Sequence, residues 1–299
     1  MSQAGKSVEA QKGLEVRASI RPHSLWEFYR FSYVLGLRSL SRRHAKSVAA
    51  LFLEPCNYWR NIEIPAVLNH LRVQPGEHVL DVGSPKLPSL FLSHRVGANV
   101  RATDLFPYFF EEYSHYLARL GKPAGDGGYQ MEVQDARSLA YPDRHFEKAY
   151  AISVLEHIED EGDTRAIREI ARVLKPGGVC CLTVPFASRY YESTISKELY
   201  YRKPVDGKPV FYERHYDSEA LWRRLLAPSG LRVEKVEYFG ERWISFEHLY
   251  SSFPRLLRIL LAPWGPLFSK MFLYRLREES SGTAKMALVV LRKDDVSRS

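Results

Sequence analysis

The sequence predicts an α/β protein with a mostly parallel, doubly wound sheet, a helical N-terminal part and a helical C-terminal insertion. From about residue 72, short runs rich in apolar and β-branched residues alternate with amphipathic segments of helix length. This alternation predicts parallel strands joined by right-handed crossovers. Apolar runs such as Val179–Val184 are typical of a strand that helices cover on both faces.

The first part of the chain has a different pattern. Residues 1–20 are polar and lack an apolar period, which predicts a disordered tail. Residues 21–71 are predicted to form an N-terminal helical extension, closed by a helix over Ile64–Leu71. This extension is rich in arginine and in aromatic residues: Trp26, Phe28, Tyr29, Phe31, Tyr33, Tyr58 and Trp59.

Residues 72–239 carry the alternating pattern and are predicted to form the main domain. Strands are predicted at His78–Gly83, Val100–Leu105, Tyr129–Gln134, Lys148–Ser153, Val179–Pro185 and Leu231–Tyr238. Helices are predicted near Lys86–Val96, Tyr108–Leu120, Asp163–Leu174 and Ser218–Ala227. Residues 240–283 form an amphipathic helical insertion in this interpretation, and residues 284–299 hold a final strand and a tail.

The chain has 299 residues, a formal net charge of +8 and a pI near 9.3. Such a balance favours acidic partners, for example nucleic acid, anionic lipid or phosphorylated substrates. Arginines that solvate helix faces explain the same charge. Charge alone therefore does not indicate nucleic acid, which we do not expect as a partner.

Cysteine and histidine usage indicates neither a disulfide framework nor a metal site. Cys56, Cys180 and Cys181 are an odd set without metal-ligand spacing, and the adjacent pair lies in an apolar run. With no apolar signal segment at the N-terminus, these cysteines predict a cytoplasmic protein. The longest apolar stretch, Leu256–Phe268, is interrupted by Arg258 and two prolines and falls short of a membrane span.

Acidic residues follow the first two predicted strands. Asp81 ends the first strand and Gly83 allows a close approach of backbone and ligand. The helix that follows offers unpaired N–H groups to an anion, here a carboxylate rather than a phosphate. Asp104, followed by Leu105, comes about 20 residues later, the spacing at which a carboxylate binds ribose hydroxyls. These two sites also fit a dinucleotide dehydrogenase.

Two further sites distinguish between the classes of nucleotide-binding protein. Asp135 follows the third strand and can accept a hydrogen bond from an adenine amino group, while the Ala136 N–H can donate to the ring. The fourth site, Tyr150–Ile158, lies at the carboxyl end of the fourth strand, where open α/β sheets bind ligands. A nicotinamide oxidoreductase has no role for these two sites.

Five motifs resemble those of the class I S-adenosylmethionine (SAM)-dependent methyltransferases, especially the type 11 subgroup. They occur in the family's order and are Leu80–Gly83, Thr103–Leu105, Gln134–Ala136, Val154–Ile158 and Arg172–Gly178. A weaker match begins at Arg214–Asp217 and ends near residue 240. The resemblance implies a Rossmann-like, seven-stranded sheet whose last strand is antiparallel.

The resemblance also implies SAM as the cofactor and gives each strand end a role. The implied contacts are Asp81 and Gly83 under the methionine and ribose, Asp104 and Leu105 at the ribose, Asp135 and Ala136 at the adenine, and Ser153 at the sulfonium.

The loop after the first strand departs from the family pattern. It reads Gly83-Ser84-Pro85-Lys86, where the family has two more glycines. Because proline removes an N–H donor and fixes φ, the turn must differ in detail. We expect Ser84 and Lys86 to contact the cofactor, with Lys86 pairing with its carboxylate. The alternative is a solvated lysine at the start of a helix.

A hydroxyl or amine acceptor must lose a proton, and two histidines are candidate bases. His157 ends the fourth site, and histidine accepts protons near neutral pH. The alternative is that it caps a helix or shapes the pocket wall. His215 precedes a predicted helix with Asp217 as its N-cap, and the alternative is an ordinary surface or core histidine. Glu156 is expected to accept a bond from a backbone N–H at a helix start.

Two regions have open interpretations. Tyr58 and Glu63 either close over the methionine end of the cofactor or serve packing and solvation. The insertion over residues 240–283 forms a cap over the acceptor or a dimer surface, or else helices that contact a membrane through Trp243, Trp264 and nearby arginines.

These observations predict an enzyme that moves a methyl group from SAM to an oxygen or nitrogen acceptor on a small molecule, sugar or lipid-linked substrate. One alternative is an RNA or protein methyltransferase that uses the basic surface. Another is a non-catalytic methyltransferase-like adaptor, suggested by the altered Ser84–Lys86 loop. No pattern indicates the oligomeric state.

Overall fold

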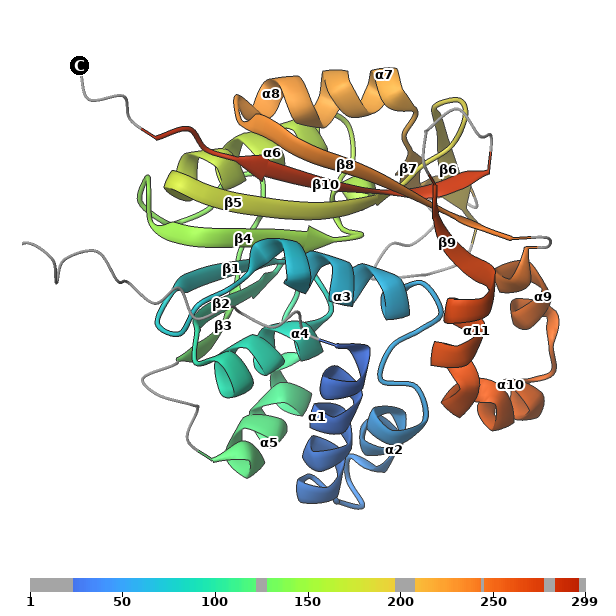
Figure 1. Cartoon of the computed structure of the whole chain (residues 1–299). Coiled ribbons are helices and arrows are strands. Elements are labelled where there is room, and N and C mark those ends of the chain that lie inside the picture. The colour runs from blue at the N-terminus through green and yellow to red at the C-terminus, as the bar shows by residue number, and fades with distance from the viewer. Residues whose placement is uncertain (1–23, 122–127, 197–207, 243–244, 277–282, 296–299) are drawn as a thin grey trace, which may run out of the picture.

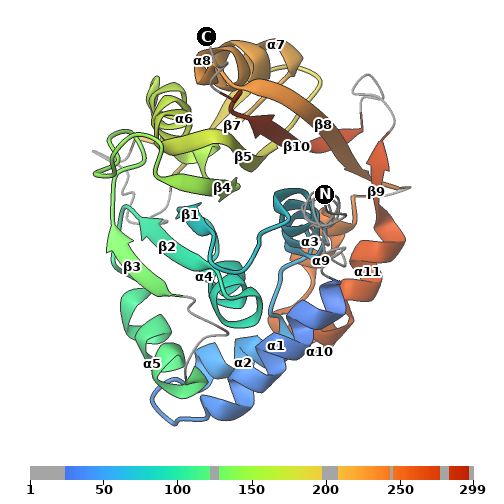
Figure 2. The same ribbon diagram turned by 60° about the vertical axis from the view of Figure 1, so that its left-hand side comes forward.

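The computed structural model describes residues 24–121, 128–196, 208–242, 245–276 and 283–295. The tail predicted over residues 1–20 and the side chain of Trp243 lie outside these residues. The described chain folds around one large sheet with helices on both faces (Figures 1 and 2). The prediction of a doubly wound α/β fold is therefore confirmed.

The central sheet has eight strands in the order β3-β2-β1-β4-β5-β10-β8-β9. The strands from β3 to β5 in this order pair in parallel, and β10 runs antiparallel between β5 and β8. Their bounds are β1 (His78–Val82), β2 (Asn99–Asp104), β3 (Tyr129–Val133), β4 (Phe146–Ile152), β5 (Leu174–Pro185), β8 (Arg232–Glu241), β9 (Leu273–Leu276) and β10 (Ala284–Arg292).

The prediction of seven strands was wrong by one. The extra strand is β9, which lies inside the predicted helical insertion and pairs antiparallel with residues 238–241 of β8. An edge strand such as β8 has backbone N–H and C=O groups that need partners, and the chain leaving the insertion supplies them. When β9 is left out, the remaining seven strands match the arrangement that the family resemblance implies, including the antiparallel last strand.

Alternate residues of the strands face two separate cores, as the period of two in a strand requires. On β10, Met286 and Leu288 belong to the first core, whereas Ala287 and Val289 belong to the second. The first core lies under α1 (Leu25–Arg38), α2 (Ala45–Leu53), α3 (Arg60–Leu71), α4 (Lys86–Phe91), η3 (Leu92–Val96) and α5 (Phe110–Leu120). The second lies under α6 (Gly162–Val173), α7 (Ser218–Leu221), η5 (Trp222–Leu226) and α8 (Ala227–Ser229).

The aromatic residues of the N-terminal extension supply part of the first core. Phe28 and Phe31 of α1 are buried, and their rings lie 5.7 and 5.5 Å from the ring of Phe91 in α4. A capping box between Ser24 and Glu27 begins α1. The helices α1 and α2 thus pack on the α4–α5 side of the sheet, which leaves α3 as the part of the extension that reaches the strand ends.

A small hairpin stands apart from the large sheet. It consists of β6 (Tyr191–Ile195) and β7 (Val210–His215), which pair antiparallel. We did not predict these strands from the sequence. A bridge between Phe186 and Tyr216 joins the hairpin to the end of β5. The hairpin is thereby held over the carboxyl edge of the sheet.

The C-terminal helical unit comprises α9 (Phe246–Ser252), α10 (Arg255–Leu261), η6 (Ala262–Trp264) and α11 (Gly265–Phe272). It lies beside the start of α3 (Figure 1). The ring of Phe246 packs 5.4 Å from that of Tyr58, and Ser269 Oγ donates a hydrogen bond of 2.7 Å to the Tyr58 carbonyl. Among the described residues, no helix has the length and apolar character needed to cross a bilayer.

Candidate active site

The turn after β1 requires glycine at position 83. Gly83 has φ of 63°, and a Cβ there would come within 2.7 Å of a Val154 methyl group. A side chain at this position would be strained and would clash. The glycine thus brings the β1 turn against the loop after β4, as expected for the floor of a ligand site at the carboxyl edge.

Asp81 is completely buried beneath this turn. Its Oδ1 accepts a 3.1 Å bond from the backbone N–H of Ser84, whose own side chain is buried and donates toward the Val82 carbonyl. Burial raises the pKa of Asp81 to about 6, against the opposing effect of the nearby Lys86 ammonium. Ser84 Oγ also accepts from the Ile152 N–H at 2.8 Å, which ties the loop to β4.

Lys86 is buried, with 3% of its surface exposed, so the alternative of a solvated lysine was wrong. Its Nζ donates to the carbonyls of Ser84 and Thr103 at 2.7 and 2.8 Å. The same ammonium lies 3.7 Å from both the Asp81 and the Asp104 carboxylates. The loop therefore replaces the missing glycines with an internal cation that joins the ends of β1 and β2. Pairing of Lys86 with the SAM carboxylate remains a prediction.

Asp104 stands at the end of β2, where the sequence placed it. Its carboxylate is 12% exposed and accepts bonds from the Tyr108 hydroxyl at 3.1 Å and the Phe106 N–H at 3.3 Å. Lys86 and Tyr108 together fix its orientation at the edge of the sheet. Leu105, the next residue, is 49% exposed beside it. These positions suit a carboxylate that binds a ribose.

Asp135 already has a strong partner in the structure. Arg137 donates to both of its carboxylate oxygens, at 3.0 Å from Nε and 2.7 Å from Nη2, and lowers the pKa of Asp135. Ala136 is half-buried against the second core. Since a carboxylate has about four acceptor positions, the Arg137 pair still leaves room for an adenine amino group.

Ser153 is held by a polar group on α3 that the sequence only partly revealed. Its backbone has φ of 48°, a conformation costly for a non-glycine residue. Its hydroxyl donates to Glu63 at 2.9 Å and accepts from Arg60 at 2.8 Å. Glu63 is buried, pairs with Arg60 and also accepts from Thr183 at 2.9 Å. The alternative of a solvated Glu63 was wrong.

The two predicted catalytic histidines meet through a carboxylate that the sequence did not reveal. His215 Nε2 lies 3.1 Å from Glu213 Oε1, and His157 Nε2 lies 3.9 Å from Glu213 Oε2. Glu213 belongs to β7, and only the strand alternation of residues 210–215 places it on the same face as His215. Because the hairpin was not predicted, no local signal pointed to Glu213.

The tautomer of His157 follows from its backbone contact. Nδ1 lies 2.9 Å from the Tyr212 carbonyl, which only accepts, so Nδ1 carries the proton. The lone pair of the neutral ring is then on Nε2, the nitrogen that faces the Glu156 and Glu213 carboxylates at 3.9 Å each. A ring in this state can accept a proton, and the Glu213 carboxylate stabilises the resulting cation.

Glu156 is buried next to this ring. Burial holds the pKa of its carboxyl well above the ordinary value, while the Arg60 charge opposes the shift and the Glu213 and Glu63 charges add to it. Its Oε2 has no hydrogen-bond partner among the described atoms. The charges of Arg60 and Glu63 on α3 and of Glu213 on β7 therefore all act on the Glu156 carboxyl.

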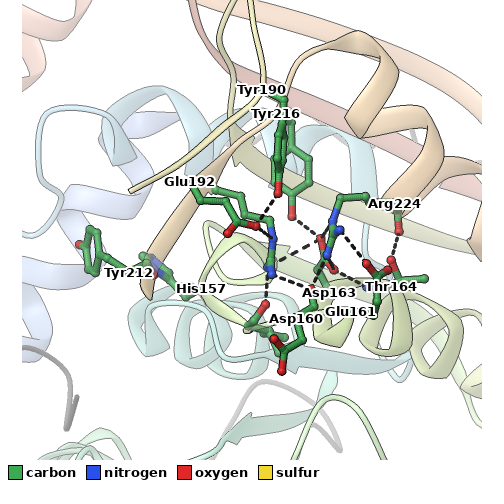
Figure 3. A network of polar contacts seen from close by, with 12 residues as sticks. His157, Asp160, Glu161, Asp163, Thr164, Tyr190, Glu192, Tyr212, Tyr216 and Arg224 are labelled. Atoms are coloured by element: carbon green, nitrogen blue, oxygen red, sulfur yellow. Dashed lines mark hydrogen bonds and ion pairs between the residues drawn. The ribbon is translucent and has the colours of Figure 1, made fainter. Parts of the chain in front are cut away.

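A buried ion network holds the hairpin against the loop that carries His157 (Figure 3). Arg224 binds both carboxylate oxygens of Asp163 at 2.8 Å, and the Tyr216 hydroxyl donates to the same carboxylate at 2.8 Å. Arg214 of β7 donates to the carbonyls of Ile158 and Asp160. The network therefore determines where Glu213 lies relative to His157.

Two remaining expectations concern the helix cap and metals. Asp217 caps α7, accepting a bond of 2.8 Å from the Ala220 N–H, as predicted. Among the residues that the structure describes, no three histidine, cysteine or carboxylate side chains are arranged to hold a metal ion.

The raised pKa of Asp81 leads to a pH-dependent prediction. A raised folded-state pKa favours folding while the carboxyl is protonated, so this contribution is full below about pH 4 and is lost as pH rises through about 6. As pH rises from below about 4 to well above 6, the free energy of unfolding of wild type minus that of Asp81→Asn should fall by on the order of 3 kcal/mol. Urea titration over this range measures it.

A control of opposite sign is available at Asp143. Arg172 lowers the pKa of the exposed Asp143, so the corresponding difference for Asp143→Asn should rise slightly with pH. A flat difference for Asp81→Asn would contradict the buried, protonatable carboxyl.

Taken together, the strand order and the polar strand ends at one edge define a Rossmann-like α/β protein with a candidate nucleotide-binding edge. Residues 80–182 match a family model described as a methyltransferase domain. The match supports the resemblance of this part of the chain to the type 11 subgroup of the class I SAM-dependent methyltransferases.

Individual relatives agree with the family assignment. Demethylmenaquinone methyltransferase of Mycobacterium tuberculosis is 26% identical over 213 residues, covering 68% of this chain and 82% of that protein. Sterol 24-C-methyltransferase of Yarrowia lipolytica is 31% identical over 155 residues, covering 50% of this chain and 39% of that protein. The chain also spans less than half the length of three further curated relatives.

A solved structure supports the fold. Geranyl diphosphate methyltransferase in complex with SAM superposes with a TM-score of 0.52 at 14% identity, covering 78% of this chain and 85% of that chain. The cofactor of the family is SAM. The described residues fit it on two observations, the glycine-only turn at Gly83 and the partly exposed, oriented carboxylate of Asp104.

Proposed function

We propose that the protein transfers a methyl group from SAM to an oxygen or nitrogen atom of a small-molecule, sugar or lipid-linked acceptor. The observation that carries the proposal is that the predicted cofactor residues and the His157–Glu213 pair lie at one edge of the sheet. Cofactor binding and proton removal are both needed for such a reaction, and here neighbouring loops supply them.

Residues from three strand ends would hold the cofactor. Asp104 would bind the ribose hydroxyls, and the β1 turn at Gly83 would lie under the methionine part. Ser153, fixed by Arg60 and Glu63, would line the sulfonium. When bound, SAM supplies an electrophilic methyl group. The contribution of the chain is alignment, and well-oriented reactants can gain about 7–11 kcal/mol from it.

His157 is assigned the role of general base. Its Nε2 takes the proton that the acceptor hydroxyl or amine loses as the new bond to carbon forms. Glu213 stabilises the imidazolium that results. His215 contacts the same Glu213 carboxylate and so belongs to the same proton-accepting group.

The relatives support an apolar acceptor. Two of them are named for a sterol and for demethylmenaquinone. We therefore give quinones, sterols and lipid-linked sugars priority as candidate acceptors, and we infer that the protein acts in the cytoplasm or at the surface of a membrane.

Calorimetric titration with SAM and with its demethylated product tests the cofactor assignment. We expect binding in the micromolar range, weakened 10- to 100-fold by Asp104→Ala, because a charged hydrogen-bonding group contributes about 1.5–3 kcal/mol. Asp143→Ala is the matched control, since its side chain is 70% exposed and pairs with Arg172. Failure of the wild type to bind either ligand would overturn the enzyme assignment in favour of an adaptor.

A further inference from the structure

The C-terminal helical unit exposes large apolar side chains. Leu257 and Leu260 are one turn apart on α10, and Leu267 and Met271 are one turn apart on α11, with Trp264 between the two helices. Leu260, Trp264 and Leu267 are 71%, 58% and 53% exposed. We call these five residues the apolar face. Several exposed large apolar side chains on neighbouring helices of a folded protein mark a site of contact with a partner or a lipid.

The inner side of the same unit already provides its packing. The ring of Phe246 packs against those of Phe268 and Phe272, with centroid distances of 5.0 and 4.4 Å. Ser269 is buried against Tyr58. Because the helices are secured from this side, the apolar face is not needed to hold the unit to the rest of the molecule.

The charge of this segment is strongly one-sided. Residues 246–276 contain four basic residues, Arg255, Arg258, Lys270 and Arg275, and one acidic residue, Glu247, which Trp59 binds. The segment thus carries +3 of the net charge of +8. Arg258 and Lys270 are exposed beside the apolar face. Exposed apolar residues with a tryptophan and an excess of flanking cations are characteristic of a surface that binds in the interface of an anionic bilayer.

The unit is also directly coupled to the active-site edge. Trp59 Nε1 donates to Glu247 at 2.7 Å and Asn61 Nδ2 donates to Ser269 at 3.1 Å. Arg60, between these two residues, is the one that binds Ser153. A protein resting on its apolar face would thus hold the start of α3 and the nearby strand ends close to the bilayer.

We propose that the apolar face docks on the surface of an anionic phospholipid bilayer. Leu260, Trp264 and Leu267 enter the interface, and Arg258 and Lys270 lie at the lipid phosphates. The length of α10 and α11, seven and eight residues, makes this a surface contact and not a span. The proposal does not depend on the methyl acceptor.

Co-sedimentation with phosphatidylcholine vesicles, with and without phosphatidylserine, tests the proposal on the full chain. We expect the wild type to bind the phosphatidylserine vesicles, with affinity that falls as salt rises. A Leu260→Ser, Trp264→Ser, Leu267→Ser variant should bind at least about 10-fold more weakly. An Arg258→Gln, Lys270→Gln variant should lose the preference for phosphatidylserine.

Trp222→Ser provides the matched control, because Trp222 has the same exposed fraction as Trp264, 58%, and begins η5 on the other side of the sheet. It should bind vesicles as the wild type does. SAM affinity should be unchanged in all variants, which separates this proposal from the function above. Absence of vesicle binding, or equal binding by the triple variant, would refute the proposal. Self-association that the triple variant abolishes, without vesicle binding, would assign the face to a second copy of the chain.

Discussion

Replacing Asp163 with alanine should lower the free energy of unfolding by about 3–5 kcal/mol, because it removes one partner of a buried ion network. Asp163 is fully buried, and Arg224 and Arg214 have only 10% and 1% of their side chains exposed. Without the carboxylate, Arg224 and the Tyr216 hydroxyl lose a buried hydrogen-bond acceptor, and Arg214 loses an ion pair at 3.9 Å. Chemical denaturation of the variant and the wild type measures the loss.

Glu161→Ala is a matched control for this substitution. Glu161 binds the same guanidinium of Arg224 at 2.9 Å, but its side chain is 69% exposed. Exposed ion pairs contribute at most about 1 kcal/mol, so the control should change stability little. Equal losses in the two variants would show that burial does not determine the strength of this network.

Replacing His157 with glutamine should lower kcat by about 10²- to 10⁴-fold on an acceptor that the wild type methylates, because the proton acceptor is lost. SAM affinity should stay near that of the wild type, because the predicted cofactor contacts do not include His157. The measurement is transfer of labelled methyl groups from SAM to the acceptor found by screening quinones, sterols and lipid-linked sugars, together with calorimetry of SAM binding.

His78→Gln is the control, since His78 starts β1 at the opposite edge of the sheet. It should leave kcat unchanged. If His215→Gln abolishes transfer and His157→Gln does not, the base is His215. His157 is then the second histidine at the Glu213 carboxylate. An unchanged kcat in both variants would show that neither histidine acts as the general base.

The sequence by itself determined the architecture and the positions of the strand ends. The period of two in the strands and the longer period of the helices are local, so segments of about ten residues predicted β1 to β5 and α4 to α6. Acidic residues such as Asp81 and Asp104 lie at the ends of those strands, and parallel strands bring their carboxyl ends to one edge. For this reason the candidate cofactor residues could be predicted without coordinates.

Only the tertiary structure decided which of these side chains meet. The sequence did not decide whether Lys86 faces solvent or a ligand. Its burial between two carboxylates depends on how β1, α4 and β2 pack together. The Glu213 contact with His157 spans 56 positions of the chain and arises because the Asp163 network holds β7 over the β4 loop. β9 formed a strand because the edge of β8 was available to it. Such pairings depend on the path of the whole chain, and a local pattern does not contain that path.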